Sequence, residues 1–494
     1  MTTIKSFLFV LYSKWKSKRL LSENLNGIYY QNKIRIHLIQ EASHTEFGVE
    51  HQFDKIHDYH SFKSKIPLRS YEDFIPYIHK IQKGNENILW KGLPLYLAKT
   101  SGTTAKIKYI PISKDAINFH INAARNVLVF HTAQTNTAKF LEGKMIFLQG
   151  SPALEYEYKV PTGRLSGIVY HHVPKFFLSN RIPSYVTNCI EDWEEKINAI
   201  IKETKNINLN LISGIPPWCI MFFEKLLNQN NKNTIQEIFP SLSLFIHGGV
   251  NFNPYEEKIK KLLGNNIPIL ETYPASEGFI AYQFDMHSKN LLLNINAGIF
   301  YEFIELENYN KGINNTITLE SVKTNVQYVL IISTNSGLWR YIIGDTIKFK
   351  TLKLFTITVT GRIKQFISAF GEHVIAEEIE IVMRECIQKF NLDLVEFHVC
   401  PNMKNNSYAW YLEINNEIID TTIIANFLHQ CLAEKNIYYM DLVEGKIINT
   451  PTIHLLRKNS FFDYQKKIGK LGGQNKIVRI ANETVMAESL MSIQ

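Results

Sequence analysis

A run of hydroxyl residues and lysines around Gly102 is the first segment whose residue types could do chemistry. Residues 99–111 read Lys-Thr-Ser-Gly-Thr-Thr-Ala-Lys-Ile-Lys-Tyr-Ile-Pro. Backbone N–H groups and hydroxyls in such a loop can surround phosphate oxygens, and lysines can neutralise them. The spacing is not that of the nucleotide-binding P-loop, Gly-x-x-x-x-Gly-Lys-Ser/Thr. A solvated Ser/Thr-rich turn between two strands explains the segment, taken alone, equally well.

A second segment, residues 271–278, reads Glu-Thr-Tyr-Pro-Ala-Ser-Glu-Gly and follows an apolar run. Ligands usually bind where strands of an α/β sheet end. A carboxylate in this place could hold Mg²⁺, which prefers oxygen ligands shared with phosphates. Ser276 does not belong to a hydrolase elbow, because the Gly-x-Ser-x-Gly pattern is absent. The alternative interpretation is an ordinary capped turn.

The third segment, residues 339–346, reads Trp-Arg-Tyr-Ile-Ile-Gly-Asp-Thr. An Asp directly after a Gly at the end of a strand can bind both hydroxyls of a ribose, as acidic residues do in other nucleotide sites. Asp345 is therefore a candidate ligand for a nucleoside. A plain β-turn is the alternative.

Two glycine-containing segments come later in the chain. Thr360-Gly361-Arg362 leads to residues 369–374, Ala-Phe-Gly-Glu-His-Val, and residues 469–479 read Gly-Lys-Leu-Gly-Gly-Gln-Asn-Lys-Ile-Val-Arg. A lysine on a glycine-rich loop suits a residue that enters a site in only one conformation. The alternative for the last segment is a basic tail, which is the usual role of such sequences.

The elements that must position these segments alternate between strands and helices. Apolar runs predict strands at 145–149, 209–212, 242–246 and 267–270, with helices at 190–204 and 221–227 between them. Residues 1–95 are expected to be largely helical. Strands that alternate with helices indicate a largely parallel, doubly wound sheet.

The pattern changes after residue 290. Alternating apolar and polar residues at 291–295, 298–305, 327–334 and 351–360 predict antiparallel strands that form a distorted β-barrel part. A helix, two strands and a helix are then expected at 377–390, 395–400, 409–414 and 421–432. The expected fold class is α/β: a large N-terminal α/β domain over 1–361 with this barrel part, and a smaller, mobile C-terminal α+β domain over 362–494.

Composition limits the classes of protein. The chain has 494 residues, 54 Lys+Arg against 46 Asp+Glu, and a formal net charge of +8 that is spread along the sequence. A nucleic-acid binder normally shows a basic patch with interleaved aromatics, so no nucleic-acid partner is expected. The 5 cysteines form no Cys-x-x-Cys pair, which indicates a reducing compartment and a cytoplasmic protein. No stretch is apolar enough for a membrane span, and an amphipathic helix is expected at the N-terminus.

Together, the order and spacing of these segments resemble the auxin-responsive acyl acid amido synthetase family, which comprises the plant indole-acetate and jasmonate conjugating enzymes and their bacterial relatives. That family belongs to the firefly luciferase superfamily of adenylate-forming enzymes. The resemblance covers nearly the whole chain. It includes residues 44–48 (His-Thr-Glu-Phe-Gly), 214–218 (Gly-Ile-Pro-Pro-Trp) and 248–252 (Gly-Gly-Val-Asn-Phe).

The resemblance implies an ATP- and Mg²⁺-dependent acid–amino acid ligase with assigned residues. Glu277 would bind Mg²⁺, Asp345 the ribose, and Lys476 would swing towards the α-phosphate as a catalytic lysine. Arg362 would lie at the hinge between the domains. The remaining implied nucleotide contacts are the phosphate-loop residues Ser101, Gly102, Thr103 and Thr104 with Lys106 or Lys108 nearby, the backbone at Gly248 and Gly249, and the pocket residues Tyr273 and Ser276.

The sequence departs from the family pattern in two places. The phosphate loop is one residue shorter before Lys106 and lacks the second glycine, and His373 stands where plant members carry a lysine. No catalytic lysine is therefore assigned to position 373. Candidate residues for lining the acid pocket are Trp218, Phe222, Phe223 and Tyr282, although aromatics at such spacing are more often core.

The implied reaction joins a small carboxylic acid to an amine, expected to be an amino acid, through an acyl-adenylate. An acyl-CoA ligase shares the first step and is the nearest alternative; a non-catalytic nucleotide-binding protein is another. Nucleic-acid ligation would need a Lys-x-Asp-Gly-type motif, which the sequence lacks. The expected oligomeric state is a monomer or a weak dimer.

Overall fold

The computed structural model describes residues 4–493 except for the segments 101–106, 174–179, 250–251, 253–254, 265–266, 364–365, 416–419 and 469–476. The chain divides into two units, which are described separately. The first unit contains most of the chain up to Ile363. The second contains the chain from Phe366 onwards, together with Thr100, Ile107 and Glu191–Ile197. Of the helices described, none is long and apolar enough to cross a membrane.

The N-terminal part of the first unit is helical, as predicted. Its helices are α1 (Ile4–Leu25), α2 (Gly27–Ala42), α3 (Glu46–Glu50), α4 (Tyr59–Lys65) and α5 (Ile75–Gln82). Local sequence sets their ends: Asp58 and Ser61 form a capping box at the start of α4, and α5 carries a proline in its first turn.

A mixed sheet of 11 strands runs through the first unit in the order β11-β12-β13-β14-β10-β9-β8-β7-β6-β3-β5. Its parallel half contains β3 (Lys144–Leu148), β5 (Arg181–Ile182), β6 (Leu209–Gly214), β7 (Leu244–Gly248) and β8 (Ile269–Ala275). Its antiparallel half contains β9 (Gly278–Gln283), β10 (Leu291–Leu293), β11 (Ile299–Glu305), β12 (Gln327–Thr334), β13 (Tyr341–Thr351) and β14 (Thr356–Arg362). A second, three-stranded sheet contains β1 (Tyr96–Thr100), β2 (Lys108–Ile112) and β4 (Thr162–Gly163).

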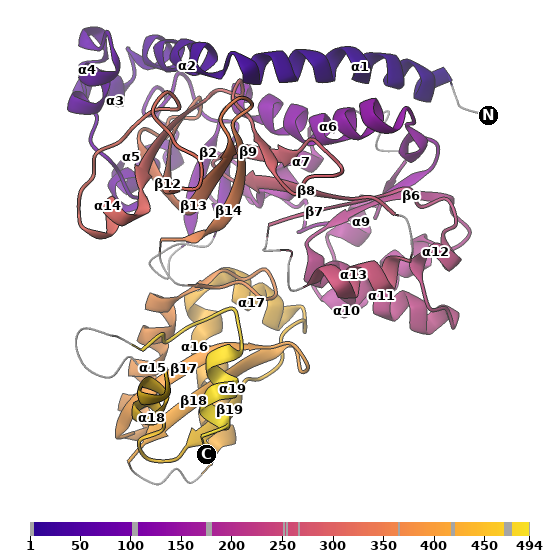
Figure 1. The fold of residues 1–494 in the computed structure, drawn as a ribbon, viewed down its shortest axis with the longest axis vertical. Coiled ribbons are helices and arrows are strands. Elements are labelled where there is room, and N and C mark those ends of the chain that lie inside the picture. The colour runs from indigo at the N-terminus through magenta and orange to yellow at the C-terminus, as the bar shows by residue number, and fades with distance from the viewer. Residues whose placement is uncertain are drawn as a thin grey trace. The chain divides into compact units, whose positions relative to one another are not determined.

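Helices cover both faces of the parallel half, which is the doubly wound arrangement that the sequence predicts. Figure 1 shows α6 on one side of these strands and α11, α12 and α13 on the other. The helices in this part of the chain are α6 (Lys114–Thr135), α7 (Leu165–Tyr170), α9 (Tyr185–Asn188), α10 (Trp193–Glu203), α11 (Pro216–Asn230), α12 (Ile235–Ile238), α13 (Glu256–Leu263) and α14 (Leu306–Asn310).

The antiparallel half differs from the expectation in one strand. The prediction of a single strand over 351–360 is wrong, because a turn at 352–355 separates β13 from β14. Phe355 has a φ of 52° in this turn. The left-handed backbone is uncommon for a bulky aromatic residue, so the sequence carries no sign of the reversal.

The second unit is an α+β assembly, as predicted. Its elements are β15 (Phe366–Ile367), β16 (Val374–Ile375), α15 (Ala376–Phe390), β17 (Leu394–Asn402), β18 (Ser407–Ile414), α16 (Thr421–Lys435), α17 (Ile437–Glu444), β19 (Thr452–Leu456), α18 (Ser460–Lys467) and α19 (Val485–Met491). β18 pairs antiparallel with β17 and parallel with β19. The cysteines of this unit, Cys386, Cys400 and Cys431, are buried and form no disulfide, as expected for apolar filler.

A buried ion pair ties the N-terminal helices to the antiparallel strands. Arg340 Nε lies 3.1 and 3.0 Å from the two carboxylate oxygens of Glu302, and both residues are buried. The Arg340 Nη1 group donates to the backbone carbonyls of Lys63 at 3.0 Å and Ile66 at 2.7 Å, and Nη2 donates to Thr316 Oγ1 at 2.7 Å. Arg340 directly precedes β13, so its guanidinium joins the start of that strand to the end of α4 and to β11.

Substitution of Glu302 by Gln removes the charge that Arg340 needs in the core. We expect Glu302→Gln to lower the free energy of unfolding by about 3–5 kcal/mol, because an unpaired buried charge remains. Urea denaturation followed by circular dichroism measures this loss. Glu307→Gln is the control: it breaks the exposed Lys311–Glu307 ion pair and should leave the unfolding midpoint nearly unchanged. Equal effects of the two substitutions would contradict the role of the buried pair.

Candidate active site

Asp345 is held by residues from two different strands. It lies on β13 opposite Arg362 of β14. Its Oδ1 accepts a hydrogen bond from Arg362 Nε at 2.6 Å, and its Oδ2 accepts one from the hydroxyl of Tyr273 on β8. In the sheet order, β14, β10 and β9 lie between β13 and β8. The sheet must therefore curl between these strands to bring Tyr273 and Asp345 into contact, which is the distorted barrel part that the sequence predicts.

The position of Asp345 within its strand differs from the prediction. The sequence placed this aspartate at a strand end or in a plain turn. Both placements are wrong, because β13 continues on either side of it, while its role as a ribose ligand stays a prediction. Gly344 has a φ of 95°, and the pairing with β14 shifts between Thr346 and Ile347. A glycine with positive φ beside a bulge re-aims the neighbouring side chains without ending the strand.

Burial and charge set the protonation of this cluster. Asp345 is 6% exposed, whereas the side chain of Arg362 is 30% exposed. The pKa of Tyr273 lies well above its usual range, mainly because the residue is buried and also because the Asp345 carboxylate is close. Its hydroxyl therefore remains a hydrogen-bond donor. Each carboxylate oxygen has a second lone pair, so Asp345 can accept a further hydrogen bond from a ligand hydroxyl.

Ser276 and Glu277 form the turn between β8 and β9, whose first pair is Ala275 with Gly278. A Cβ on Gly278 would lie 2.4 Å from Ile299 Cδ1, so close packing requires glycine after Glu277. Burial raises the pKa of the Glu277 carboxyl, and Lys108 and Arg362 only partly offset this effect. Glu277 is thus a desolvated carboxylate near two cations.

Lys108 is the first residue of β2 and is 7% exposed. Its Nζ lies 3.3 Å from the Tyr341 hydroxyl and 5.3 Å from the centre of the Tyr71 ring. The Tyr71 hydroxyl also accepts a hydrogen bond from the backbone N–H of Tyr109 at 2.7 Å, which fixes the start of β2. Two aromatic rings and a hydroxyl therefore stabilise the ammonium group inside the protein.

The two glycines at the end of β7, Gly248 and Gly249, allow the chain to leave the sheet. Gly248 ends β7 and pairs with Thr272, and a Cβ on it would lie 2.5 Å from Thr272 Oγ1. Gly249 has a φ of 87°. These residues leave the sheet at the edge where the neighbouring parallel strand β8 leads to Tyr273, the usual place for ligands in such sheets.

Several predicted site residues lie outside the described part of the chain. These are Ser101, Gly102, Thr103, Thr104 and Lys106 in the phosphate loop, and Lys476 near the C-terminus. Their roles remain predictions. Among the predicted residues that are described, the structure brings together Lys108, Tyr273, Glu277, Asp345 and Arg362.

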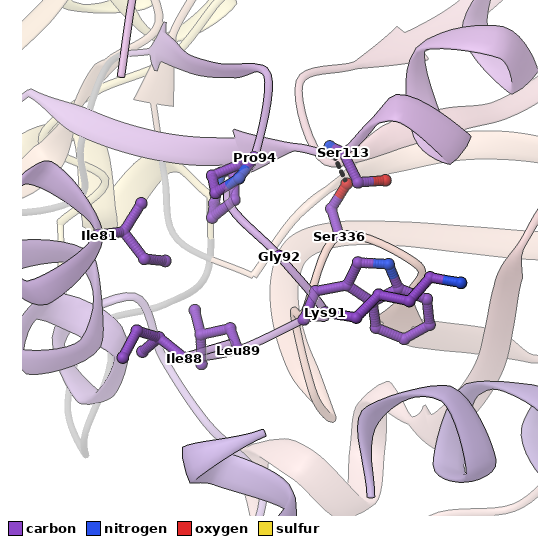
Figure 2. Close-up of a pocket in the computed structure, with 10 residues that line it drawn as sticks. Ile81, Ile88, Leu89, Lys91, Gly92, Pro94, Ser113 and Ser336 are labelled. Atoms are coloured by element: carbon purple, nitrogen blue, oxygen red, sulfur yellow. Dashed lines mark hydrogen bonds between the residues drawn. The ribbon is translucent and has the colours of Figure 1, made fainter. Parts of the chain in front are cut away.

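The sequence analysis missed Tyr71 and Tyr341 as neighbours of Lys108. Tyr341 stands within the segment that contains Asp345, but Tyr71 follows no motif, and only tertiary contact reveals it. The candidate acid-pocket residues Phe222, Phe223 and Tyr282 are at most 1% exposed and pack in the core, which is the alternative that the sequence left open. A small, mostly apolar pocket lined by Ile81, Ile88 and Leu89 contains none of the predicted site residues (Figure 2).

A second group of titratable residues lies on the same strands. His247 of β7 pairs in register with Glu271 of β8, two residues before Tyr273. His247 is buried and stacks on Phe252 with ring centres 3.7 Å apart, and burial lowers its pKa to about 3. Burial also raises the pKa of Glu271 to about 7, despite the opposing effect of Lys289. This carboxyl changes charge near neutral pH.

Comparisons with protein families identify the chain. The models of the GH3 family N-terminal, central and C-terminal domains match residues 17–186, 292–361 and 377–485. The chain belongs to the GH3 family. The resemblance inferred from the sequence is confirmed: this is the amido synthetase family of the adenylate-forming superfamily.

Individual GH3 relatives are distant but align over most of the chain. A jasmonoyl–L-amino acid synthetase of Nicotiana attenuata, JAR4, is 21% identical over 84% of this chain and 85% of its own length. A jasmonoyl–L-amino acid synthetase of Oryza sativa subsp. japonica, GH3.5, is 22% identical over 94% of this chain and 91% of its own.

Two solved structures share the fold of this GH3 chain. The AtGH3.15 acyl acid amido synthetase in complex with 2,4-DB superposes with a TM-score of 0.61 at 15% identity, covering 97% of this chain and 96% of that one. A 2-hydroxyisobutyryl-CoA ligase in complex with 2-HIB-AMP and CoA gives 0.54 at 11% identity, covering 97% and 91%. At these identities the likeness establishes the fold and not the acceptor.

The raised pKa of Glu271 has a measurable consequence for stability. Between the ordinary value of 4.5 and the folded value of about 7, the folded state holds more protons than the unfolded state, so stability falls as pH rises. Glu271→Gln removes this penalty and should stabilise the protein by about 2 kcal/mol more at pH 8 than at pH 4.5, after allowance for partial exposure. Urea denaturation at a series of pH values measures the difference.

Glu256→Gln is the matched control, because Lys260 and Lys289 lower the pKa of Glu256. Its carboxylate contributes stability that is lost as pH falls through the folded pKa, so the substitution should be most costly at neutral pH. The two variants must therefore show pH dependences of opposite sign. A pH-independent effect of Glu271→Gln would contradict its buried, titrating state.

Proposed function

We propose that this chain is an ATP-dependent acyl acid amido synthetase. It activates a small carboxylic acid as an acyl-adenylate, releases pyrophosphate, and transfers the acyl group to an amine, with AMP as the second product. The observation that carries the proposal is the Asp345 carboxylate, held by Tyr273 and Arg362 beside Glu277 and Lys108, in a chain of the GH3 family.

The nucleotide is bound mainly by this cluster. Asp345 accepts hydrogen bonds from the ribose hydroxyls, because its oxygens have lone pairs beyond those used by Tyr273 and Arg362. Tyr273 and Ser276 line the adenylate pocket, and the absence of side chains at Gly248 and Gly249 allows close approach of the backbone. Lys108 faces the phosphates, with the segment 101–106 contributing Ser101, Gly102, Thr103, Thr104 and Lys106.

Glu277 fits the role of a Mg²⁺ ligand. Its carboxyl has a raised pKa because burial outweighs nearby cations, and a divalent cation beside it would restore the charged form. The described residues contain no group of three or more ligands for a metal. Mg²⁺ usually binds one or two carboxylates and completes its coordination shell with waters and phosphate oxygens, so a site with one protein carboxylate is sufficient. When bound, the ion neutralises charge on the phosphate oxygens.

The reaction needs two displacements. In the first, a carboxylate oxygen of the acid forms a bond to the α-phosphorus of ATP, and the bond to pyrophosphate breaks. In the second, the amine nitrogen bonds to the acyl carbon, the bond to AMP breaks, and the nitrogen loses a proton. Because charge spreads over phosphoryl oxygens in the first step, positioning and fixed cations supply most of the acceleration.

The two-unit organisation supports one pocket that serves both steps. Residues 1–361 act as the adenylation domain and residues 362–494 as a lid that rotates between the steps, with Arg362 at the hinge. Lys476 approaches the α-phosphate in the adenylating arrangement. A moving lid also limits hydrolysis of the reactive adenylate.

The acceptor is an amino acid, as the names of the jasmonoyl–L-amino acid synthetases state for those relatives. The location included in this proposal is the cytoplasm. Its reducing conditions agree with the free cysteines of the chain, most of which are buried. It acts as a monomer or weak dimer.

Carboxylate-dependent exchange of labelled pyrophosphate into ATP tests the first step. With a mixed library of small acids, the wild-type protein should show exchange with particular acids. Glu277→Gln should lower the exchange rate by about 100-fold, as expected for loss of one preorganised charge, and raise the Mg²⁺ concentration needed. Glu320→Gln, an exposed carboxylate elsewhere in the first unit, is the control and should behave as wild type. Undiminished exchange in Glu277→Gln would contradict its role.

Asp345→Asn tests the ribose contact. Loss of the charge should raise the KM for ATP by about 10- to 100-fold, since 1.4 kcal/mol corresponds to a factor of ten. Tyr273→Phe removes one donor while leaving the Asp345–Arg362 pair intact, so a smaller rise is expected. Initial rates at varied ATP concentration, with thermal melting to confirm folding, measure both. An unchanged KM for ATP in Asp345→Asn would exclude the assigned role.

A further inference from the structure

Helix α1 turns its small polar residues towards the protein. Ser6, Ser13 and Ser17 are buried on its inner face, together with Leu20 and Asn24. Ser6 donates to the Ala138 carbonyl, and Asn24 donates to the carbonyls of Leu293 and Leu354 at 2.9 Å each. These contacts fix which face of α1 meets the rest of the unit.

The opposite face of α1 carries large apolar side chains that remain in solvent. Their exposed fractions are Ile4 80%, Phe7 57%, Leu8 58%, Leu11 51% and Trp15 57%. The spacing of three or four residues places them in one line along the helix, which we call the α1 apolar strip. Isolated exposed apolar residues are ordinary, but a continuous strip of this kind marks an interaction surface.

Positive charge flanks the α1 apolar strip on both sides. At 100° per residue, Lys14 falls on one side of the strip and Lys5 and Arg19 fall on the other, while Lys18 continues the line of the strip beyond Trp15. Glu23 is the one acidic residue of α1, and it pairs with Arg19 at 3.1 Å, so most of the positive charge of this face comes from Lys5, Lys14 and Lys18. The guanidinium of Arg19 lies 5.8 Å from the centre of the Trp15 ring. The exposed face of α1 is therefore apolar along its middle and cationic at its edges.

The position of α1 leaves this face open within its unit. α1 packs along α6, and Figure 1 shows α1 as the outermost helix on that side of the sheet. The strip lies on the side of α1 away from its buried serines, so it is separate from Asp345 and its partners, and the proposed ligase chemistry does not use it.

We propose that α1 docks the protein on an anionic lipid surface, with the α1 apolar strip inserted at the level of the headgroups. Interfacial helices combine Trp, Phe and Leu on one face with Lys and Arg beside it. The long basic side chains reach the lipid phosphates while the apolar residues enter the acyl boundary. A helix that lies on the membrane in this way does not need the length or apolarity of a membrane span.

The charge pattern favours a lipid surface over a second copy of the chain. Two strips packed together would bring Lys14 and Lys18 of one copy near the same lysines of the other, and like charges across an interface cost free energy. An anionic bilayer presents negative charge on both sides of the helix at once, which matches cations on both flanks.

Vesicle sedimentation of the full-length protein tests the proposal. The protein should bind vesicles of phosphatidylcholine with 30% phosphatidylserine at low salt, and bind pure phosphatidylcholine vesicles at least about tenfold less, because each basic residue near the surface adds attraction. Leu8→Gln with Leu11→Gln should reduce binding to the anionic vesicles at least about tenfold. Lys14→Glu with Lys18→Glu should abolish the preference for anionic lipid.

The controls separate this surface from folding and from catalysis. Ile313→Gln alters an apolar residue of similar exposure, 50%, elsewhere in the unit and should bind like wild type. All variants should keep the wild-type melting temperature and pyrophosphate exchange rate, so loss of exchange would bear on the proposed function and not on docking. Failure of the wild type to bind anionic vesicles would overturn the proposal. So would a dimer in sedimentation velocity that the Leu8/Leu11 variant abolishes, or vesicle binding that this variant retains.

Discussion

The candidate site depends on one carboxylate that joins strands from both halves of the sheet. Asp345 binds Arg362 across a direct strand pair, but its bond to Tyr273 spans the strands between β13 and β8. Such a contact forms only if the antiparallel half curls back towards the end of the parallel half. The curl also brings the Ser276–Glu277 turn, which follows Tyr273 by three residues, close to Arg362. Without the curl, Tyr273 and Glu277 would lie several strands away from Asp345 and Arg362.

The start of β13 is fixed by the residue that precedes it. Arg340 is in the left-handed region, with a φ of 45°, and its guanidinium is fully used by Glu302, Thr316 and the carbonyls at the end of α4. This arrangement directs the next residue, Tyr341, towards Lys108. The strained backbone is stabilised by the buried pair, and it positions a tyrosine beside the lysine that faces the proposed phosphate site. Packing far from the ligand thus determines the geometry near it.

The sequence predicted which residues form the cluster better than it predicted their geometry. Glu277 and Asp345 were candidates from local residue types, whereas Tyr273 and Arg362 were implied by the family resemblance, and the structure brings these four residues together. The strand position of Asp345 was not predictable, since the irregularity around Gly344 depends on pairing with β12, where the register shifts between Val329 and Ile331. Tyr71 was missed because its contact with Lys108 joins residues that no motif links. In α1 the pattern predicted an amphipathic helix, but the serine face that packs inward is visible only in the fold.

Charge balance gives a physical reason for a site completed by another part of the chain. The two cations that act on Glu277 are Lys108 and Arg362, and the carboxylates beside them are Glu277 and Asp345, so these residues nearly neutralise one another. Under the proposed function, a triphosphate adds several negative charges that this cluster alone does not offset. Mg²⁺, Lys106 and Lys476 would supply the missing positive charge while pyrophosphate is present. Under the same proposal, less charge needs compensation once pyrophosphate leaves, so Lys476 would be able to withdraw and give the amine access to the acyl-adenylate without destabilising the nucleotide.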